Sequence, residues 1–237
     1  AGRYIHLEPH QLFRLGSVLA WLHTMTGLRR YRTAYNEIPR KDGKTLEAAV
    51  IALYLAFFDG EPGAEAYCIA TKRDQAKIVF NDCKRLVQSS GLRSRVRVLM
   101  ANLHRPESAS KLEPLCADSD SPDGLNPNVV TADELHAYKE RALLDVMEPA
   151  PGARRQPLNF QITTAGSNPV SPCGNQHDYA VKILEQVLDD DTFFAFIAHA
   201  DPEADWTEER TWRKANPNYG VRVKVEDRRA LATKAKN

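Results

Sequence analysis

Residues 44–58 form an apolar segment that strongly limits what the chain can fold into. The run KTLEAAVIALYLAFF carries apolar side chains on nearly every side of a helix. Such a helix must be covered by other elements, so we expect it in the interior of a large domain. With 237 residues, the chain is long enough to provide that interior without disulfides or structural metals.

Strand-like and helix-like patterns alternate around this segment. Helical spacing covers 7–21, 44–58 and 71–89, and strand-like runs fall at 32–38, 64–70, 96–101, 111–116, 128–132 and 158–163. Strands that alternate with helices favour a three-layer α/β fold with a mostly parallel central sheet.

The pattern changes after Gly166. A helix at 177–188, an aromatic strand at 192–200 and a helix at 207–215 predict a small, lid-like appended subdomain. We therefore expect a core at 1–170 and an appended subdomain at 171–237.

Composition excludes several classes of protein. With 32 Lys and Arg against 31 Asp and Glu, the net charge is +1, so the chain is not a globally basic nucleic-acid binder. No apolar run reaches the roughly 18 residues that a membrane span requires. Charge is nevertheless uneven: 72–97 is basic and 183–209 is acidic, which fits either two solvated helix faces or a basic surface for a polyanion. The 4 cysteines form no C-x-x-C pair, and we interpret them as buried, reduced thiols.

The short motif Gly43-Lys44-Thr45 falls between a predicted strand and the buried helix. Backbone N–H groups at a helix N-terminus, together with the helix dipole, attract the phosphates of a nucleotide. Glycine lets the loop come close, lysine reaches the β and γ phosphates, and the threonine hydroxyl binds Mg²⁺. The motif therefore predicts an ATP site, although Ile38 stands where the full phosphate-loop pattern has glycine.

Two carboxylates, Asp133 and Glu134, end a later apolar strand. Asp133 is suited to hold Mg²⁺, and Glu134 is suited to polarise the water that attacks the γ phosphate. A simple acid pair at a helix start is the alternative, but a position about 90 residues after Lys44 favours the ATPase interpretation. Thr163 and Thr164 stand at the end of the strand expected at 158–163, where adjacent hydroxyls can sense the γ phosphate.

Taken in order, these and other segments resemble the ATPase domain of the large subunit of tailed-phage terminases, in the group associated with HK97-like phages. The segments that carry the resemblance are LEPHQ at 7–11, IPRKDGKT at 38–45, ATKRDQA at 70–76, DGLNP at 123–127, DELH at 133–136, GARR at 152–155, TTAG at 163–166 and KANPN at 214–218.

The resemblance implies a P-loop ATPase that uses ATP and Mg²⁺. The family's Walker A motif lacks the first glycine, so Ile38 fits it, whereas Asp42 stands where relatives often have asparagine. An added carboxylate beside the phosphates is unfavourable unless it faces away. The implied roles are nucleotide binding by Gln11 (to adenine), Arg40, Lys41, Asp42, Gly43, Lys44 and Thr45, metal binding by Thr45 and Asp133, and catalysis or coupling by Glu134, Arg40, Arg155, Thr163 and Thr164.

The arginine that serves the transition state stays open. Arg40 can act in cis, and Arg154 or Arg155 can reach a neighbouring subunit's site in trans. A surface basic pair before Pro157 is the alternative for the last two. We expect His136 to pack or cap rather than to relay protons.

By the same resemblance, the chain is the motor domain that moves double-stranded viral DNA into a procapsid in the host cytoplasm. The implied partners are the portal, the small terminase subunit and further copies of the chain in a ring, with no membrane. The family's C-terminal nuclease domain is expected to be absent here, with 171–237 including the start of the linker toward it. The alternatives are another P-loop DNA-dependent ATPase and a non-hydrolysing nucleotide-binding module.

Overall fold

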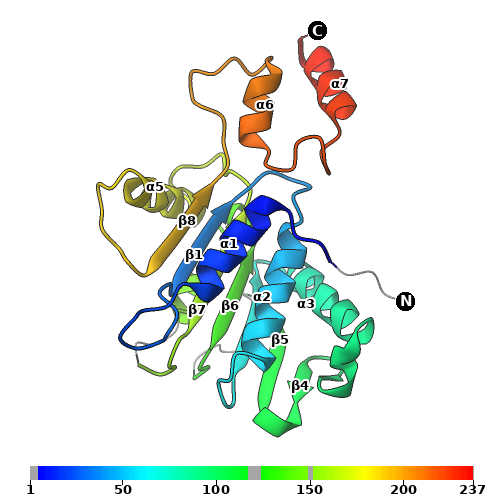
Figure 1. Ribbon diagram of the computed structural model, residues 1–237, viewed down its shortest axis with the longest axis vertical. Coiled ribbons are helices and arrows are strands. Elements are labelled where there is room, and N and C mark those ends of the chain that lie inside the picture. The colour runs from blue at the N-terminus through cyan, green and yellow to red at the C-terminus, as the bar shows by residue number, and fades with distance from the viewer. Residues whose placement is uncertain (1–4, 117–123, 149–151, 237) are drawn as a thin grey trace.

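The structure is a computed structural model that describes residues 5–116, 124–148 and 152–236 (Figure 1). In these residues the strands form one eight-stranded sheet with the order β3-β4-β5-β2-β6-β7-β1-β8. Every neighbouring pair from β5 to β8 is parallel, and β3 and β4 add antiparallel pairs at one edge. The predicted α/β class with a mostly parallel sheet is confirmed.

The bounds of the elements follow the chain. The strands are β1 (Thr33–Glu37), β2 (Glu65–Ala70), β3 (Arg97–Val98), β4 (Leu103–Arg105), β5 (Ser110–Cys116), β6 (Val129–Asp133), β7 (Leu158–Thr163) and β8 (Phe193–Ile197). The α-helices are α1 (Pro9–Ala20), α2 (Lys44–Phe57), α3 (Arg73–Gln88), α4 (Ala142–Val146), α5 (Pro172–Leu184), α6 (Glu209–Ala215) and α7 (Val225–Lys236). Short 3₁₀ turns are η1 (Gly91–Ser94), η2 (Pro106–Ser108) and η3 (Leu135–Ala137).

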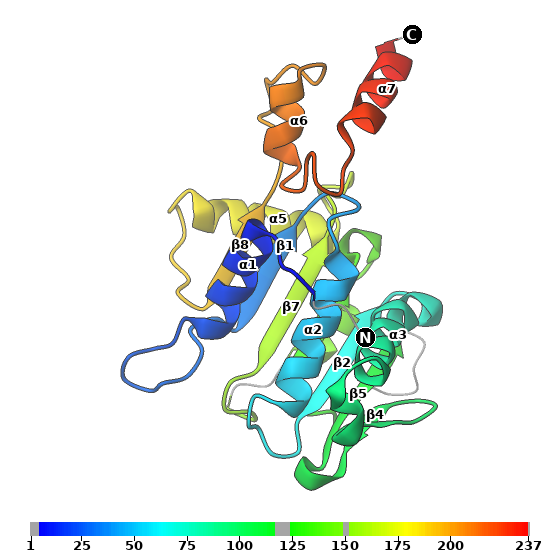
Figure 2. The same cartoon turned by 45° about the vertical axis from the view of Figure 1, so that its right-hand side comes forward.

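Helices cover both faces of the sheet, which gives the three predicted layers (Figures 1 and 2). Side chains of α1, α2 and α3 share one buried apolar cluster with one face of the strands. Side chains of η3, α4 and α5 form a second cluster with the other face. The apolar helix α2 lies at the centre of the first layer, as its sequence requires.

The structure differs from the sequence-based prediction at β8. The aromatic strand assigned to the appended subdomain pairs in parallel with β1 over Thr33–Glu37 and forms an edge of the central sheet. α5 packs on β8, so both belong to the sheet and its layers although they lie beyond residue 170. A cut at residue 170 therefore does not separate the sheet from the appended part. Among the described helices, α6 and α7 are the ones that lie away from the sheet (Figure 2).

Other differences are local. The run 96–101 was expected as a strand of the alternating pattern, but only Arg97–Val98 is strand, and it pairs antiparallel with β4. β4 and α7 were not predicted, because three residues carry too little periodicity and α7 has no buried side chain. α5 begins earlier than expected, at Pro172, where the Ser171 hydroxyl caps it.

No helix within the described residues is long and apolar enough to cross a membrane. Asp123, the first residue of the segment DGLNP that carries part of the resemblance, lies outside the described residues.

Candidate nucleotide-binding site

The candidate site lies at the carboxyl ends of the parallel strands. The sheet order places β7 between β6 and β1, so the ends of these strands are adjacent. The phosphate loop follows β1, Asp133 ends β6, and Thr163 ends β7. This is the edge at which open α/β sheets bind their ligands.

The loop between β1 and α2 has the shape of an anion cradle. The Ile38 N–H donates to the Thr163 carbonyl (2.9 Å) and continues the strand, so the buried Ile38 side chain serves the core where a glycine would not. Lys41 and Gly43 both have positive φ, at 69° and 85°. Gly43 is the N-cap of α2, where its lack of Cβ makes this conformation accessible.

The structure brings the lysine motif and the acidic pair together. The Thr45 hydroxyl donates to Asp133 Oδ2 (3.2 Å) across 88 residues of sequence. Lys44 Nζ lies 3.9 Å from Glu134 Oε1 and donates to the Pro39 carbonyl (3.4 Å). A magnesium–triphosphate fits between these groups, because a hydroxyl, a carboxylate, an ammonium and a helix N-terminus converge at one edge.

The surroundings of Asp133 disfavour the ionised form of its carboxyl group. Burial raises the pKa of this carboxyl to about 6, and the neighbouring Glu134 carboxylate contributes to the rise. Hydrogen bonds from the Thr45 hydroxyl and the Glu134 N–H partly offset it. In the absence of a cation, the ionised Asp133 is therefore destabilising, and a bound Mg²⁺ would relieve that cost.

Asp133→Asn is expected to stabilise the nucleotide-free protein by about 3 kcal/mol at pH 8, since a pKa shift from 3.8 to about 6 corresponds to that free energy. The pKa is raised on folding, so the cost is present above about pH 6 and is lost as the pH falls toward 3.8. Urea unfolding of both proteins at pH 8 and near pH 5 measures the difference, which should shrink at the lower pH. A pH-independent difference would show that Asp133 carries no such cost.

Glu134 has an uncommon backbone conformation, and its side chain contacts His136. Its φ of 53° is uncommon for a residue with a Cβ, and such strain concentrates at functional sites. Glu134 Oε2 lies 3.1 Å from His136 Nδ1. His136 in turn donates its backbone N–H to the Thr163 hydroxyl (3.0 Å), and its Nδ1 lies 3.2 Å from the Thr164 hydroxyl.

His136 thus contacts both the candidate base and the candidate sensor. The sequence-based interpretation, in which His136 packs or caps, misses this position between Glu134 and the two threonines. The Thr163 hydroxyl donates to the Thr164 carbonyl (2.8 Å), so the end of β7 and the segment after β6 form one hydrogen-bonded group. These contacts connect the Glu134 side chain, through His136, with the end of β7.

A cavity of about 590 Å³ opens beside these groups, which is a size typical of small-ligand sites. Its lining includes Arg40, Lys41, Gly43, Lys44, Thr45, Asp133, Glu134 and His136. One wall comes from α3, with Gln75, Ile78 and Asp82. Sequence analysis gave these α3 residues no role in the site, although Gln75 lies in the segment 70–76 that carries part of the resemblance.

Gln11 and Asp42 lie outside this lining, in a buried cluster beneath the loop. The Asp42 side chain is 1% exposed, and its Oδ2 lies 3.2 Å from His10 Nε2 and 3.8 Å from Arg14 Nη2. Its carboxylate therefore faces away from the phosphates, which removes the conflict expected from the sequence. Gln11 donates to Glu47 Oε1 (2.8 Å) and accepts from the Glu8 N–H (2.9 Å), so contact with adenine would require it to exchange these partners.

The candidate arginines lie at opposite ends of the sheet. Arg40 lines the cavity, and its side chain is exposed. Arg154 donates to the carbonyls of Gly63 (2.8 Å) and Asn126 (2.9 Å), close to the amino ends of β2 and β6. Arg155 follows it, exposed, just before β7 begins. The length of β7, about 20 Å, separates Arg155 from the cavity in its own subunit, so a role for Arg155 requires a neighbouring copy.

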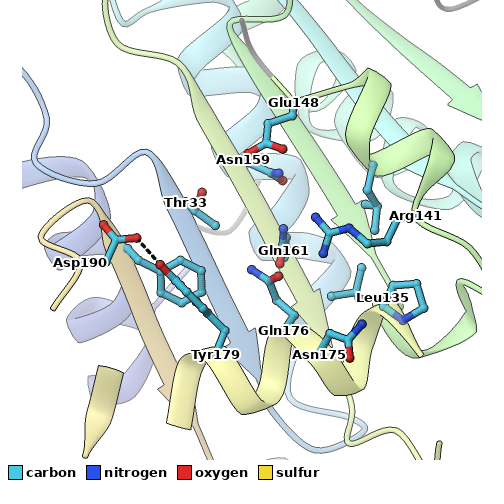
Figure 3. Close-up of a pocket in the computed structure, with 13 residues that line it drawn as sticks. Thr33, Leu135, Arg141, Glu148, Asn159, Gln161, Asn175, Gln176, Tyr179 and Asp190 are labelled. Carbon is cyan, nitrogen blue, oxygen red and sulfur yellow. Dashed lines mark hydrogen bonds between the residues drawn. The ribbon is translucent and has the colours of Figure 1, made fainter. Parts of the chain in front are cut away.

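A second cavity, of about 310 Å³, lies on the sheet face that carries η3, α4 and α5 (Figure 3). Asn159 and Gln161 project into it from β7, with Tyr179 of α5 on one side and Arg141 on the other (Figure 3). Lys44, Thr45 and Asp133 do not line it. Of these two cavities, the larger is the one lined by Lys44, Thr45 and Asp133.

The fold and the larger cavity define a P-loop nucleoside triphosphatase. The fold has three layers, and a lysine-bearing loop and an acidic strand end lie together at the carboxyl ends of the parallel strands. The family model for the terminase large subunit, ATPase domain, matches residues 9–182, more than half of the chain. The chain belongs to this family.

Known proteins agree with this assignment. The large subunit of the terminase of Enterobacteria phage HK97 is 27% identical over 246 aligned residues, covering 99% of this chain and 45% of its own length. Protein YmfN of Escherichia coli (strain K12) is 38% identical over 115 residues, covering 48% of this chain and 25% of its own. The crystal structure of the HK97 large terminase superposes with a TM-score of 0.85 at 24% identity, over 99% of this chain and 48% of that one. The chain thus spans less than half the length of these relatives.

Proposed function

We propose that this chain is the ATP-hydrolysing motor domain of a phage terminase large subunit and drives double-stranded DNA into a procapsid. The observation that carries the proposal is the meeting of Thr45 and Asp133, with Lys44 and Glu134 beside them, at the mouth of one cavity. Family membership supports ATP as the nucleotide and DNA packaging as the work.

Each residue has a specific part in the proposed reaction. Lys44 and the N-terminus of α2 hold the phosphates, and Thr45 and Asp133 hold Mg²⁺, which supplies charge neutralisation when bound. Glu134 takes the proton of the attacking water. In the nucleotide-free protein Lys44 lies near Glu134, and the arriving phosphates compete for that lysine, which frees Glu134 to orient water.

The partners are part of the proposal. We propose that copies of the chain form a ring at the portal, with the small terminase subunit, in the host cytoplasm and without a membrane. Arg40 in cis or Arg155 from a neighbouring copy supplies the cation that stabilises the transition state. Thr163 and Thr164 couple hydrolysis to movement through His136. The proposed motor core extends through β8, and the appended unit holds α6 and α7.

Lys44→Ala tests the phosphate loop. Because a hydrogen bond to a charged group contributes about 1.5–3 kcal/mol, the affinity for Mg·ATP should fall at least about tenfold. Calorimetric titration measures it, with Lys139→Ala, an exposed lysine after η3, as the matched control. Unchanged affinity in Lys44→Ala, with the fold intact by circular dichroism, would reject the phosphate-loop role.

ATP turnover with and without double-stranded DNA separates the motor from its alternatives. Stimulation by DNA of any sequence is expected for a translocase that contacts the DNA backbone. Nucleotide binding without turnover in any assembly state would instead indicate a non-hydrolysing module.

A further inference from the structure

The turn between α6 and α7 touches the phosphate loop, although more than 170 residues separate them in sequence. Asn218 is 1% exposed, and its side-chain amide donates to the Asp42 carboxylate and to the Asp42 carbonyl (3.5 Å). Figures 1 and 2 both show this connection descending to the loop that follows β1. The turn is therefore anchored to the loop through a buried contact.

Hydrogen bonds within the turn fix where its side chains point. The backbone N–H groups of Val221, Arg222 and Val223 all converge on the Asn218 carbonyl, at 3.1–3.2 Å. The Gly220 N–H donates back to the Val223 carbonyl (2.9 Å). Because Asn218 is the centre of this compact turn, the anchor on Asp42 also positions Arg222.

Arg222 lies directly against the glycine of the loop. A Cβ placed on Gly43 would meet Arg222 Nη1 at 3.5 Å and Gln11 Nε2 at 3.3 Å. The Arg222 side chain is exposed, and no described residue forms an ion pair or side-chain hydrogen bond with it. A guanidinium thus stands at the N-terminus of α2 without an acidic partner.

Arg222 adds a cation next to a cavity whose lining already carries charges of both signs. Arg222 itself lies beside the cavity, against Gly43, and is not one of the lining residues; Arg40, Lys41 and Lys44 line it together with the acids Asp82, Asp133 and Glu134, and the α2 dipole adds a partial positive charge. Asp42 does not neutralise these cations, because its carboxylate is buried beside His10, Arg14 and Asn218. Arg222, which has no acidic partner of its own among the described residues, therefore lies where an anion at the N-terminus of α2 would meet it.

We propose that Arg222 contacts the phosphate chain of the bound nucleotide in cis, and that Asn218 is the positioning residue that holds it there. The inference rests on the proposed ATP site and extends it to a segment outside the sheet. Through this contact the nucleotide ties the α6–α7 connection to the phosphate loop, so the presence of phosphates is communicated to α6 and α7.

Calorimetric titration of the protein with the Mg²⁺ complex of a non-hydrolysable ATP analogue tests the contact, because it measures the affinity for the nucleotide. Arg222→Ala should weaken affinity about tenfold and reduce its dependence on salt, because one charge contact with phosphate is lost. Arg222→Lys should recover part of the affinity. Arg210→Ala, an exposed arginine at the start of α6 that pairs with Glu208, should match the parent.

A double-mutant cycle tests the positioning role. Asn218→Ala should weaken affinity, and the double variant Asn218→Ala/Arg222→Ala should be no weaker than Arg222→Ala alone, since the anchor acts through the arginine. Additive losses would overturn the role of Asn218.

The remaining outcomes separate this inference from the proposed function. A parent that binds the analogue normally, beside an Arg222→Ala variant of equal affinity and equal salt dependence, overturns the inference and leaves the ATP site standing. A parent that binds no nucleotide overturns both.

Discussion

Glu134→Gln is expected to lower ATP turnover by about two to four orders of magnitude, the range that a general base contributes. The amide keeps the size of the side chain and its place at the cavity, but it cannot accept the proton of the attacking water. Single-turnover and steady-state hydrolysis assays, carried out with Mg²⁺ in the presence of DNA, measure the loss.

Nucleotide affinity should stay at the parent's level or rise in this variant. The carboxylate repels the incoming phosphates, and it lies 3.9 Å from Lys44, which the phosphates need. The matched control is Glu140→Gln, an exposed carboxylate a few residues later, which should hydrolyse ATP like the parent. If Glu134→Gln also turned over like the parent, the assignment of the base would be wrong.

Arg14→Met should destabilise the protein by about 3–5 kcal/mol, the cost of removing one partner from a buried ion pair. Arg14 is 1% exposed and donates to Glu47 Oε1 (2.8 Å), and Asp42 Oδ2 lies 3.8 Å away. Methionine keeps much of the stem volume but leaves two buried carboxylates without their cation. Urea unfolding at pH 8 measures the change, which is a large share of a typical domain's stability.

The pH dependence of this loss has a definite sign. Burial raises the pKa of Glu47, so its cost is present above that pKa and is relieved as the pH falls through it. The destabilisation by Arg14→Met should therefore shrink in acid. The double variant Arg14→Met/Glu47→Gln should recover part of it at pH 8, because one buried charge is then absent.

An exposed pair is the control for this argument. Arg141→Met breaks the pair with Asp145, whose side chains are 46% and 54% exposed, and should cost less than about 1 kcal/mol. Equal losses in Arg14→Met and Arg141→Met would show that the buried cluster has no special role. Nucleotide affinity should fall only in Arg14→Met, since Asp42 and Glu47 frame the phosphate loop.

Local chemistry made part of the site predictable. A glycine before lysine and threonine at a helix start, and two acids at a strand end, are short motifs whose function depends on neighbours in sequence. The burial of α2 was equally predictable, because a helix that is apolar on nearly all sides is stable only in the interior. Sequence reasoning placed both motifs at strand ends, and the structure joins them through Thr45 and Asp133.

Contacts between distant segments were not predictable in the same way. The aromatic strand β8 reads as a separate element from its sequence, yet it completes the sheet beside β1. Arg155 lies in one of the segments that carry the resemblance, but the length of β7 separates it from the nucleotide cavity of the same subunit. Arg222 carries no motif at all and lies against Gly43.

The amino-acid sequence by itself determined the kind of chemistry and the alternation of elements, because side-chain type and periodicity are properties of neighbouring residues. The tertiary structure alone decided the strand order, the burial of the Asp42 carboxylate beneath the phosphate loop and the contact of Asn218 with that loop. These depend on pairings across 30 to 180 residues of chain, such as His10 with Asp42 and Asn218 with Asp42. Such pairings form only when tertiary packing brings both partners together and buries them.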